Sequence, residues 1–220
     1  MIQSDKFDSS IMNIKKIANS ALLFSIRRLI EIFGFIISIL GLLLFIALAT
    51  YSPNDPNFIF PDNLEINNLL GFYGSYISDL FFQSVGLISY LIPVTFFFTG
   101  INICKKKDIF LLIESIFFII LYSIFGALYF AFFYSDVFSL FINGNGGFVG
   151  DFFSKSFIKN LIIINENLSF YFLIVLIIAL FFISINFNIF KLFNLIRNFI
   201  QNPKKKNYTD KSEIISEYIP

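Results

Sequence analysis

Few side chains in this sequence could perform chemistry. Its 220 residues include no His, which removes the usual general base and the commonest metal ligand, and Cys104 is the only cysteine. A lone cysteine forms no internal disulfide, and we interpret Cys104 as a small apolar residue at a helix end. None of the eleven glycines precedes a lysine, so no Gly-x-x-x-x-Gly-Lys-Ser/Thr phosphate loop is present. The sequence therefore predicts no catalytic residue, no metal site and no cofactor.

Two acidic residues lie in or beside long apolar stretches, where ionisable groups are often functional. Glu114 falls about one turn inside such a stretch, and we expect its side chain to reach toward the nearby Lys105–Lys107. We expect Asp79 to cap the outer end of another helix, because the helix dipole favours an anion there. Structural roles are the simpler interpretation of both. The alternative is a small transporter or channel that uses both acids as polar sites.

The apolar residues, 57% of the chain, are concentrated in blocks long enough to cross a membrane. Because about 30 Å of hydrocarbon requires roughly 20 residues of helix, we predict an all-α integral membrane protein with four transmembrane helices. The four predicted spans are residues 32–50, 80–103, 110–134 and 168–190.

The four spans make up a membrane domain, residues 32–190, and the parts of the chain on either side of it are more polar. Residues 1–31 form an amino-terminal segment, and we expect residues 9–31 to form a helix on anionic lipid, continuous with the first span. Residues 191–220 are the start of a polar linker. Ala47–Ala49 resembles a signal-peptide cleavage site, but the segment before the apolar run is too long, so we predict an uncleaved first helix.

The basic residues are distributed asymmetrically about the predicted spans. All of the 16 Lys and Arg residues except Lys155 and Lys159 fall before the first span, between the second and third, or after the fourth. Because basic residues collect on the cytoplasmic side, both termini are predicted to be cytoplasmic. Within this basic set, Arg27 and Arg28 lie one helical turn before Glu31, and we expect them to face its carboxylate.

A short sequence pattern occurs twice, once in each outer loop. Residues 71–81 and 147–157 align without gaps and share five of eleven positions. The chain therefore reads as two helix–loop–helix hairpins in a weak parallel repeat. After Gly150, Phe153, Phe157 and Leu161 recur every four positions, which predicts a short amphipathic helix in the second outer loop with Asp151 paired to Lys155.

Small residues in two spans have the spacing that lets transmembrane helices approach closely. On one face of the first span they are Gly34, Ser38 and Gly41. On one face of the third span they are Ser123, Ala127 and Ala131. The sequence leaves open whether these faces meet within one chain or between subunits. Pro93 is expected to kink the second span because it removes a backbone donor.

Several of these segments together resemble one family, the FtsK/SpoIIIE DNA translocases. Residues 51–58 (YSPNDPNF) are similar to its S-x-x-P-x-D-P-x-aromatic stretch, and residues 68–81 to its N-x-x-G-x-x-G-x-x-x-x-D-x-x-F segment. Gly86 and Pro93 fall where that family has Gly and Pro, and residues 146–150 match its second-loop glycine motif. The resemblance covers roughly residues 25–200.

The resemblance implies the amino-terminal four-helix membrane domain of such a translocase. In that family this domain lies in the bacterial inner membrane at the division septum. It forms homo-oligomers, which are hexamers, and it contacts other membrane proteins of the divisome. It implies no direct nucleic-acid binding by this segment. The residues expected to shape the periplasmic face are Pro53, Asp55, Pro56, Gly71, Gly74, Asp79, Gly147 and Gly150.

The sequence departs from the family pattern at its end. It stops at Pro220, before any motor domain, so DNA translocation is not assigned to these residues. The leading hypothesis is a membrane anchor and assembly domain of a septal translocase, acting in cell division and chromosome segregation. The alternatives are the transporter or channel described above and a membrane scaffold unrelated to DNA.

Overall fold

The structure is a computed structural model that describes residues 2–56, 66–135, 143–156, 158–186 and 197. The chain falls into two units, Met1–Asn186 and Phe187–Pro220, and the helices α1 to α7 belong to the first. Every regular element in the described residues is helical. The expectation of an all-α protein is confirmed.

Within the described ranges, four stretches of helix are long and apolar enough to cross a membrane, as expected. Each contains or consists of one long helix of the first unit. These helices are α1 (Ile2–Ala49), α3 (Leu91–Lys106), α4 (Phe110–Phe133) and α7 (Glu166–Ser184).

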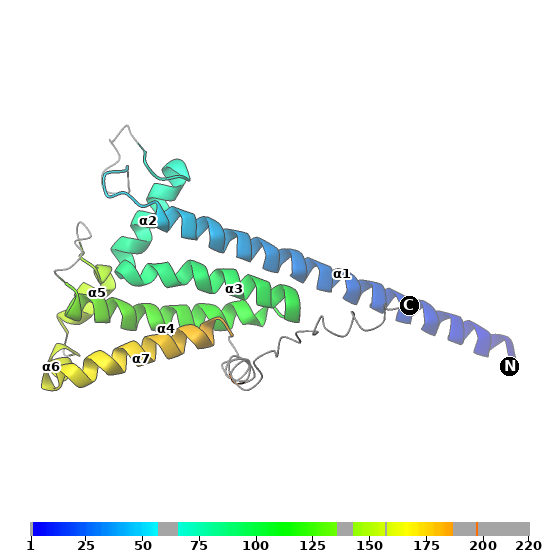
Figure 1. Ribbon diagram of the computed structural model, residues 1–220. Coiled ribbons are helices and arrows are strands. Elements are labelled where there is room, and N and C mark those ends of the chain that lie inside the picture. Colours follow the sequence, from blue (N-terminus) through cyan, green and yellow to red (C-terminus); the bar gives the residue numbers. More distant parts are fainter. Residues whose placement is uncertain (1, 57–65, 136–142, 157, 187–196, 198–220) are drawn as a thin grey trace, which may run out of the picture. The chain divides into compact units, whose positions relative to one another are not determined.

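The long helices pack as two hairpins, the first made of α1 and α3 and the second of α4 and α7. α1 lies along α3, and α4 lies along α7, with α3 and α4 joined by a tight turn (Figure 1). Lys107 closes the turn in the left-handed conformation (φ 57°), and its N–H donates to the carbonyl of Ile103 at 2.7 Å. The Asp108 carboxylate then accepts the N–H of Phe110 at 2.9 Å, which starts α4.

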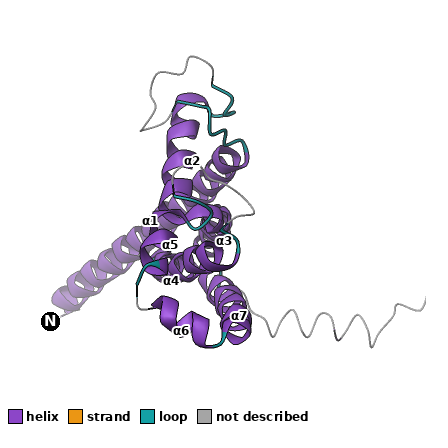
Figure 2. Cartoon of the chain, turned by 90° about the vertical axis from the view of Figure 1, so that its left-hand side faces the viewer, coloured by secondary structure: helices purple, strands orange, loops and turns teal. Residues whose placement is uncertain are grey.

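The region expected as one second span, residues 80–103, is not a single helix. α2 (Gly71–Val85) ends before Gly86, a short 3₁₀-helix η1 (Gly86–Tyr90) follows, and α3 begins at Leu91. Gly86 has φ 71°, a conformation that only glycine adopts at little cost, so the chain turns there. α2 runs across the direction of the long helices (Figures 1 and 2).

Pro93 does not produce this bend. It lies in the first turn of α3, where a missing N–H disrupts few helical hydrogen bonds. The direction of the chain changes earlier, at Gly86.

The second outer loop carries two short helices where one amphipathic helix was expected. α5 (Gly147–Ser154) and α6 (Ile158–Ile164) are separated at Lys155–Phe157. Phe157, one of the residues that suggested a single helix, lies outside the described part of the chain. The predicted ion pair is confirmed, because Lys155 Nζ lies 2.7 Å from an Asp151 carboxylate oxygen.

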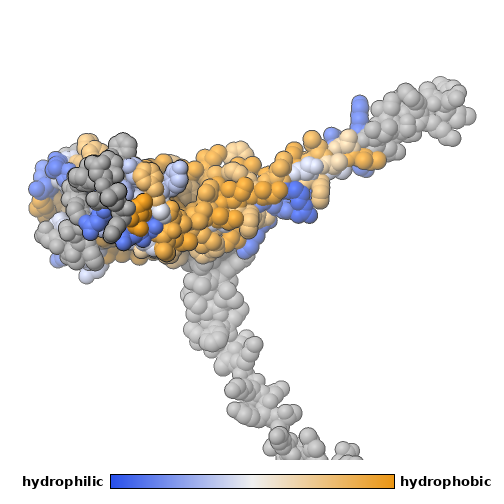
Figure 3. Space-filling model, turned by 90° about the horizontal axis from the view of Figure 1, so that it is seen from above, coloured by the Kyte–Doolittle hydropathy of each residue, from blue (hydrophilic) through white to orange (hydrophobic). Residues whose placement is uncertain are grey.

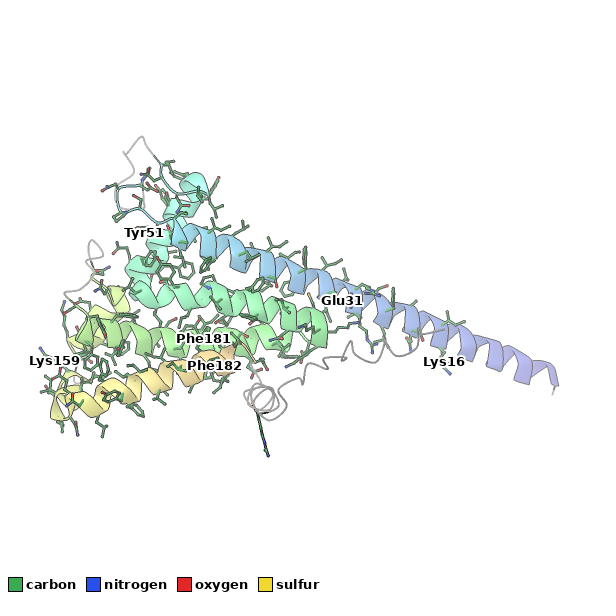
Figure 4. The ribbon with its side chains drawn as sticks, in the orientation of Figure 1. Lys16, Glu31, Tyr51, Lys159, Phe181 and Phe182 are labelled. Carbon is green, nitrogen blue, oxygen red and sulfur yellow. The ribbon has the colours of Figure 1, made fainter. Side chains whose placement is uncertain are left out.

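α1 is one unbroken helix through Glu31. Arg28 pairs with Glu31 at 2.6 Å, as its spacing predicted, and no Arg27 pair accompanies it among the ion pairs of the described residues. Lys107, from the turn between α3 and α4, also reaches Glu31, at 2.8 Å. This ion pair places Glu31 level with the end of α3, as Figure 4 shows.

Candidate functional site

Asp55 organises the first outer loop. Its buried carboxylate accepts three hydrogen bonds, from the N–H and the side-chain amide of Asn67 (2.9 and 3.0 Å) and from the N–H of Asn68 (2.8 Å). Such donors satisfy a buried anion without a cation. Asp55 therefore holds residues 67 and 68, at the end of the loop, against the segment that follows α1.

Asn68 connects the end of α1 to the start of α2. Its amide nitrogen donates to the carbonyls of Ala47 (2.8 Å) and Thr50 (3.3 Å), which lack partners at the end of a helix. Its amide oxygen accepts the N–H of Leu70 at 3.1 Å. A side chain at Gly74 would overlap this amide, so glycine at 74 leaves the space that Asn68 occupies.

The prolines and Gly71 shape the backbone of the same loop. Pro53 stands second in a turn that the N–H of Asp55 closes on the carbonyl of Ser52 at 3.1 Å. The carbonyl of Pro56 accepts the Ser75 hydroxyl at 2.7 Å. Gly71 has φ 64° and open space around it, so its contribution is conformational. We call this assembly, residues 50–56 with 67–75, the outer cap.

Asp79 does not cap a helix. It is the ninth residue of α2, it is buried, and its carboxylate accepts the Tyr51 hydroxyl at 3.2 Å. The Tyr51 ring packs on Phe82, with centroids 4.7 Å apart. Burial, with the nearby Asp79 charge, raises the pKa of Tyr51 well above its usual range, so the hydroxyl stays protonated and keeps donating. Tyr51 was missing from the predicted residues, although it directly follows the first span.

The second outer loop docks on the turn at Gly86. The carbonyl of Asn145 accepts the N–H of Leu87 at 2.9 Å. A Cβ added to Gly147 (φ 62°) would lie 2.6 Å from the nitrogen of Gly86, and one added to Gly86 would overlap the backbone of Asn145. The segments around Gly86 and Gly147 lie so close together that no side chain fits between their backbones. We call the contact of residues 84–87 with 145–147 the glycine joint.

Asn145 holds the glycine joint from within. It is fully buried, and its amide nitrogen donates to the carbonyl of Tyr134 at the end of α4. Sequence reasoning missed Asn145, because an Asn in a loop is ordinary and its burial depends on a contact with Gly86, far away in sequence.

The two glycine motifs adopt matching geometry. Gly71 and Gly147 are each the first residue of a helix, with φ 64° and 62°. The N–H of Gly71 donates to the carbonyl of Asn68 at 2.9 Å, and that of Gly147 to Gly144 at 3.2 Å. The sequence repeat thus corresponds to a repeated turn into a short helix.

The small-residue faces lie against other parts of the same chain. A Cβ on Gly34 would meet Gly100 and Cys104 of α3, and the Ser38 hydroxyl donates to the carbonyl of Phe97 at 3.0 Å. Gly41 faces the backbone of α3 in the same way.

The face on α4 accommodates the second loop. A Cβ on Gly150 would lie 2.5 Å from the carbonyl of Ala127 and 3.0 Å from the Cβ of Ala131. Ser123, one turn earlier, is buried.

A buried ladder of hydroxyl groups links α3, α4 and α7. Thr95 Oγ1 lies 3.1 Å from the Tyr122 hydroxyl and 3.2 Å from that of Ser184. Thr99 donates to Ser115 at 2.7 Å, and Ser115 to the carbonyl of Ser184 at 2.8 Å. These groups satisfy one another, which supports a packing role in an apolar interior.

The two acids that suggested transport are not brought together. Asp79 lies at the end of the unit that carries the outer cap, whereas Glu114 is exposed in the second turn of α4, near the opposite end. Within the described residues, no group of three His, Cys, Asp or Glu side chains could hold a metal ion. A groove of about 580 Å³ beside α1 is lined by apolar residues such as Leu40, Ile77 and Phe96. Among the residues that the structure describes, the arrangement offers packing surfaces and brings no set of reactive groups together.

Known proteins share this membrane segment. A family model described as the 4TM region of DNA translocase FtsK/SpoIIIE matches residues 26–197. DNA translocase FtsK of Rickettsia bellii (strain RML369-C) is 38% identical over 72 residues, and DNA translocase FtsK of Azospirillum brasilense is 31% identical over 88 residues. The alignments cover 33% and 39% of this chain but only 10% and 14% of these relatives, so the chain spans a small part of their length. No solved structure matches the chain.

Proposed function

The chain belongs to the family of the 4TM region of the DNA translocases FtsK and SpoIIIE, and from this premise we propose that it anchors and assembles an FtsK-type translocase in the membrane. The observation that carries the proposal is the family match over residues 26–197. This range contains the last three candidate membrane spans whole and the first one from Ile26 onward. Within the described residues, the site offers packing and no reactive centre. The proposed contribution is therefore attachment and assembly.

The surface of the first unit supports membrane attachment. Apolar side chains cover much of the face seen in Figure 3, and many large ones on α1, α4 and α7 are exposed. Lipid is the natural covering for such a surface. We place the chain in the bacterial inner membrane, at the division septum, where it would serve cell division and chromosome segregation.

The positions of charged groups support a cytoplasmic location for both ends of the membrane domain. Lys107 pairs with Glu31 of α1, and Lys106 donates to the Asn186 side chain just after α7 at 3.3 Å. The basic turn, α1 and the end of α7 therefore meet at one end of the first unit. Because basic residues favour the cytoplasmic side, this end would face the cytoplasm and the outer cap the periplasm.

The proposed partners are other copies of this chain, in a ring that the family resemblance suggests is hexameric, and membrane proteins of the divisome. We assign no direct nucleic-acid binding to this segment. The outer cap and the glycine joint give the periplasmic side a defined shape, which is what recruitment by a folded partner would require.

Septal recruitment tests the proposal. The full chain fused to a cytoplasmic fluorescent protein is expected to concentrate at the septum of dividing bacteria. Gly74→Val, which displaces Asn68 from the outer cap, should insert normally yet lose much of the septal signal. Leu69→Val is the matched control, because Leu69 is exposed beside the same loop. Uniform membrane fluorescence of the unaltered chain would refute the anchoring role, and normal recruitment of Gly74→Val would refute a role for the outer cap.

A further inference from the structure

α1 is much longer than a membrane requires. Its 48 residues extend for about 72 Å at 1.5 Å each, whereas the hydrocarbon core is about 30 Å thick. Two contacts fix where the excess lies: Lys107 binds the Glu31 carboxylate, and the Cys104 thiol donates to the Glu31 carbonyl at 3.2 Å. Residues before Glu31 therefore extend past the basic turn, and Figure 4 shows Lys16 well beyond it.

This extension carries large apolar side chains that nothing in the first unit covers. Leu22, Ile26 and Leu29 are all exposed, and they lie on one side of α1 at spacings of four and three residues. The same alternation continues into the membrane part, again at exposed positions. The complete set, which we call the α1 stripe, is Leu22, Ile26, Leu29, Phe33, Ile36, Leu40 and Leu43.

Lipid can cover only part of the α1 stripe. Near Leu40 and Leu43 the surroundings are hydrocarbon, but Leu22 and Ile26 lie beyond the level of Glu31, where the turn residues Lys105–Lys107 are solvent-exposed. Because α1 runs through both regions as one unbroken helix, it cannot cross the membrane and also lie flat on its surface. A Leu or Ile side chain left in water loses the favourable free energy of apolar burial.

The spacing of the α1 stripe is typical of a helix that packs against another helix. Alternation of four and three residues is the heptad pattern of a left-handed coiled coil, in which Ile26 takes an a position and Leu22 and Leu29 take d positions. In the part of the α1 stripe that lies beyond the membrane, Ile26 at a with Leu22 and Leu29 at d is the combination that favours two parallel strands. Asn19 takes the preceding a position, where a buried Asn fixes register. Copies of one membrane protein insert in the same orientation, so their α1 helices are parallel.

We infer that the α1 stripe pairs with the α1 stripe of a second copy as a parallel coiled coil that projects past the membrane on the side of the basic turn. This inference rests on the proposed function, because it names the contact through which copies assemble. In a ring with an even number of subunits, such pairs would join neighbours two by two.

Disulfide cross-linking between copies tests the pairing. In full chains carrying Cys104→Ser, single cysteines at Leu22, Ile26 or Leu29 should give disulfide-linked dimers when native membranes are oxidised. A disulfide requires Cα atoms within about 7 Å, which facing a and d positions satisfy. Phe24→Cys is the matched control, because Phe24 is as exposed as Leu22 (59% and 60%) but points to the other side of α1.

The expected result is several-fold more dimer from the three stripe positions than from Phe24. Equal cross-linking at Phe24, or none at the stripe, would overturn the inference. The mass of the complex in lipid nanodiscs separates the two proposals. Oligomers without stripe cross-links would leave self-assembly intact and reject this contact, whereas a strictly monomeric chain would reject both.

Discussion

Individual glycines in the outer cap act for different physical reasons, although one sequence motif contains them. Gly71 needs only its left-handed backbone, because no atom lies within 4 Å of where its Cβ would be. Gly74 has an ordinary helical backbone, but a side chain there would overlap Asn68. The motif therefore combines a conformational glycine and a packing glycine.

This difference predicts unequal effects of substitution. Gly71→Ala should lower the free energy of unfolding by about 1–2 kcal/mol, the cost of a left-handed L-residue. Gly74→Val should cost more, about 2–4 kcal/mol, since it also removes the hydrogen bonds of Asn68 to α1. Thermal unfolding in lipid or detergent would measure both. A Gly71→Ala chain less stable than Gly74→Val would contradict this assignment.

Asp55 provides a second prediction at the residue scale. Asp55→Asn keeps the shape of the side chain but turns one acceptor into a donor, opposite the N–H groups of Asn67 or Asn68. We expect a loss of about 1–3 kcal/mol, the cost of a buried donor without an acceptor. Asp151→Asn makes the same chemical change in an exposed ion pair and should cost under about 1 kcal/mol. Equal shifts in thermal unfolding would show that the Asp55 contacts add nothing.

At the scale of helices, the long apolar segments and the repeat could be predicted from sequence. Residues 110–134 were expected as a span, and α4 is Phe110–Phe133, because a run of apolar residues bounded by a basic turn leaves little choice. The break at Gly86 could not be predicted in the same way. Hydropathy continues through it, and the turn depends on Asn145 and Gly147 docking from another part of the chain.

The site residues also divide into those that a local sequence pattern predicts and those that depend on contacts far away in the sequence. Asp55 and Gly74 were expected in the first outer loop from a linear motif, although the partner of each is visible only in the structure. Asn145, Tyr51 and Thr95 were missed, because a buried Asn, Tyr or Thr has no spacing that distinguishes it from an exposed one. Asp79 was expected at a helix end and instead binds Tyr51, since α2 begins eight residues earlier, at Gly71.

Two glycines in the second loop test the glycine joint. Gly144 and Gly147 both have positive φ, at 68° and 62°, but only Gly147 lies against other backbone. Gly144→Ala should therefore cost about 1–2 kcal/mol from backbone conformation alone. Gly147→Ala should lower the free energy of unfolding by the same amount and should also separate residues 145–147 from Gly86. Protease cleavage within the second loop should rise for Gly147→Ala and stay near the unaltered rate for Gly144→Ala; equal rates would refute the docking.

Considered as a whole, the first unit has the same order of elements in each hairpin. An outgoing long helix leads through a glycine turn into a short helix, α2 or α5, and a second long helix returns. η1 and α3 together contain 21 residues, Gly86–Lys106, which is enough to cross about 30 Å of hydrocarbon. α2 is therefore not needed to complete the second span. Its course across the long helices is that of a helix in the membrane surface (Figure 2).

This arrangement predicts the depth of α2 in the bilayer, and the absence of Trp from the sequence makes the depth measurable. A single Trp at Tyr73, exposed on α2, should be quenched best by lipids brominated near the headgroup. A single Trp at Phe98, exposed midway along α3, should be quenched best by lipids brominated deep in the acyl chains. If Trp at Tyr73 proved as deep as Trp at Phe98, α2 would belong to the spanning segment. If it is shallow, α2 lies in the membrane surface, with Tyr73, Ile77 and Leu80 exposed on it.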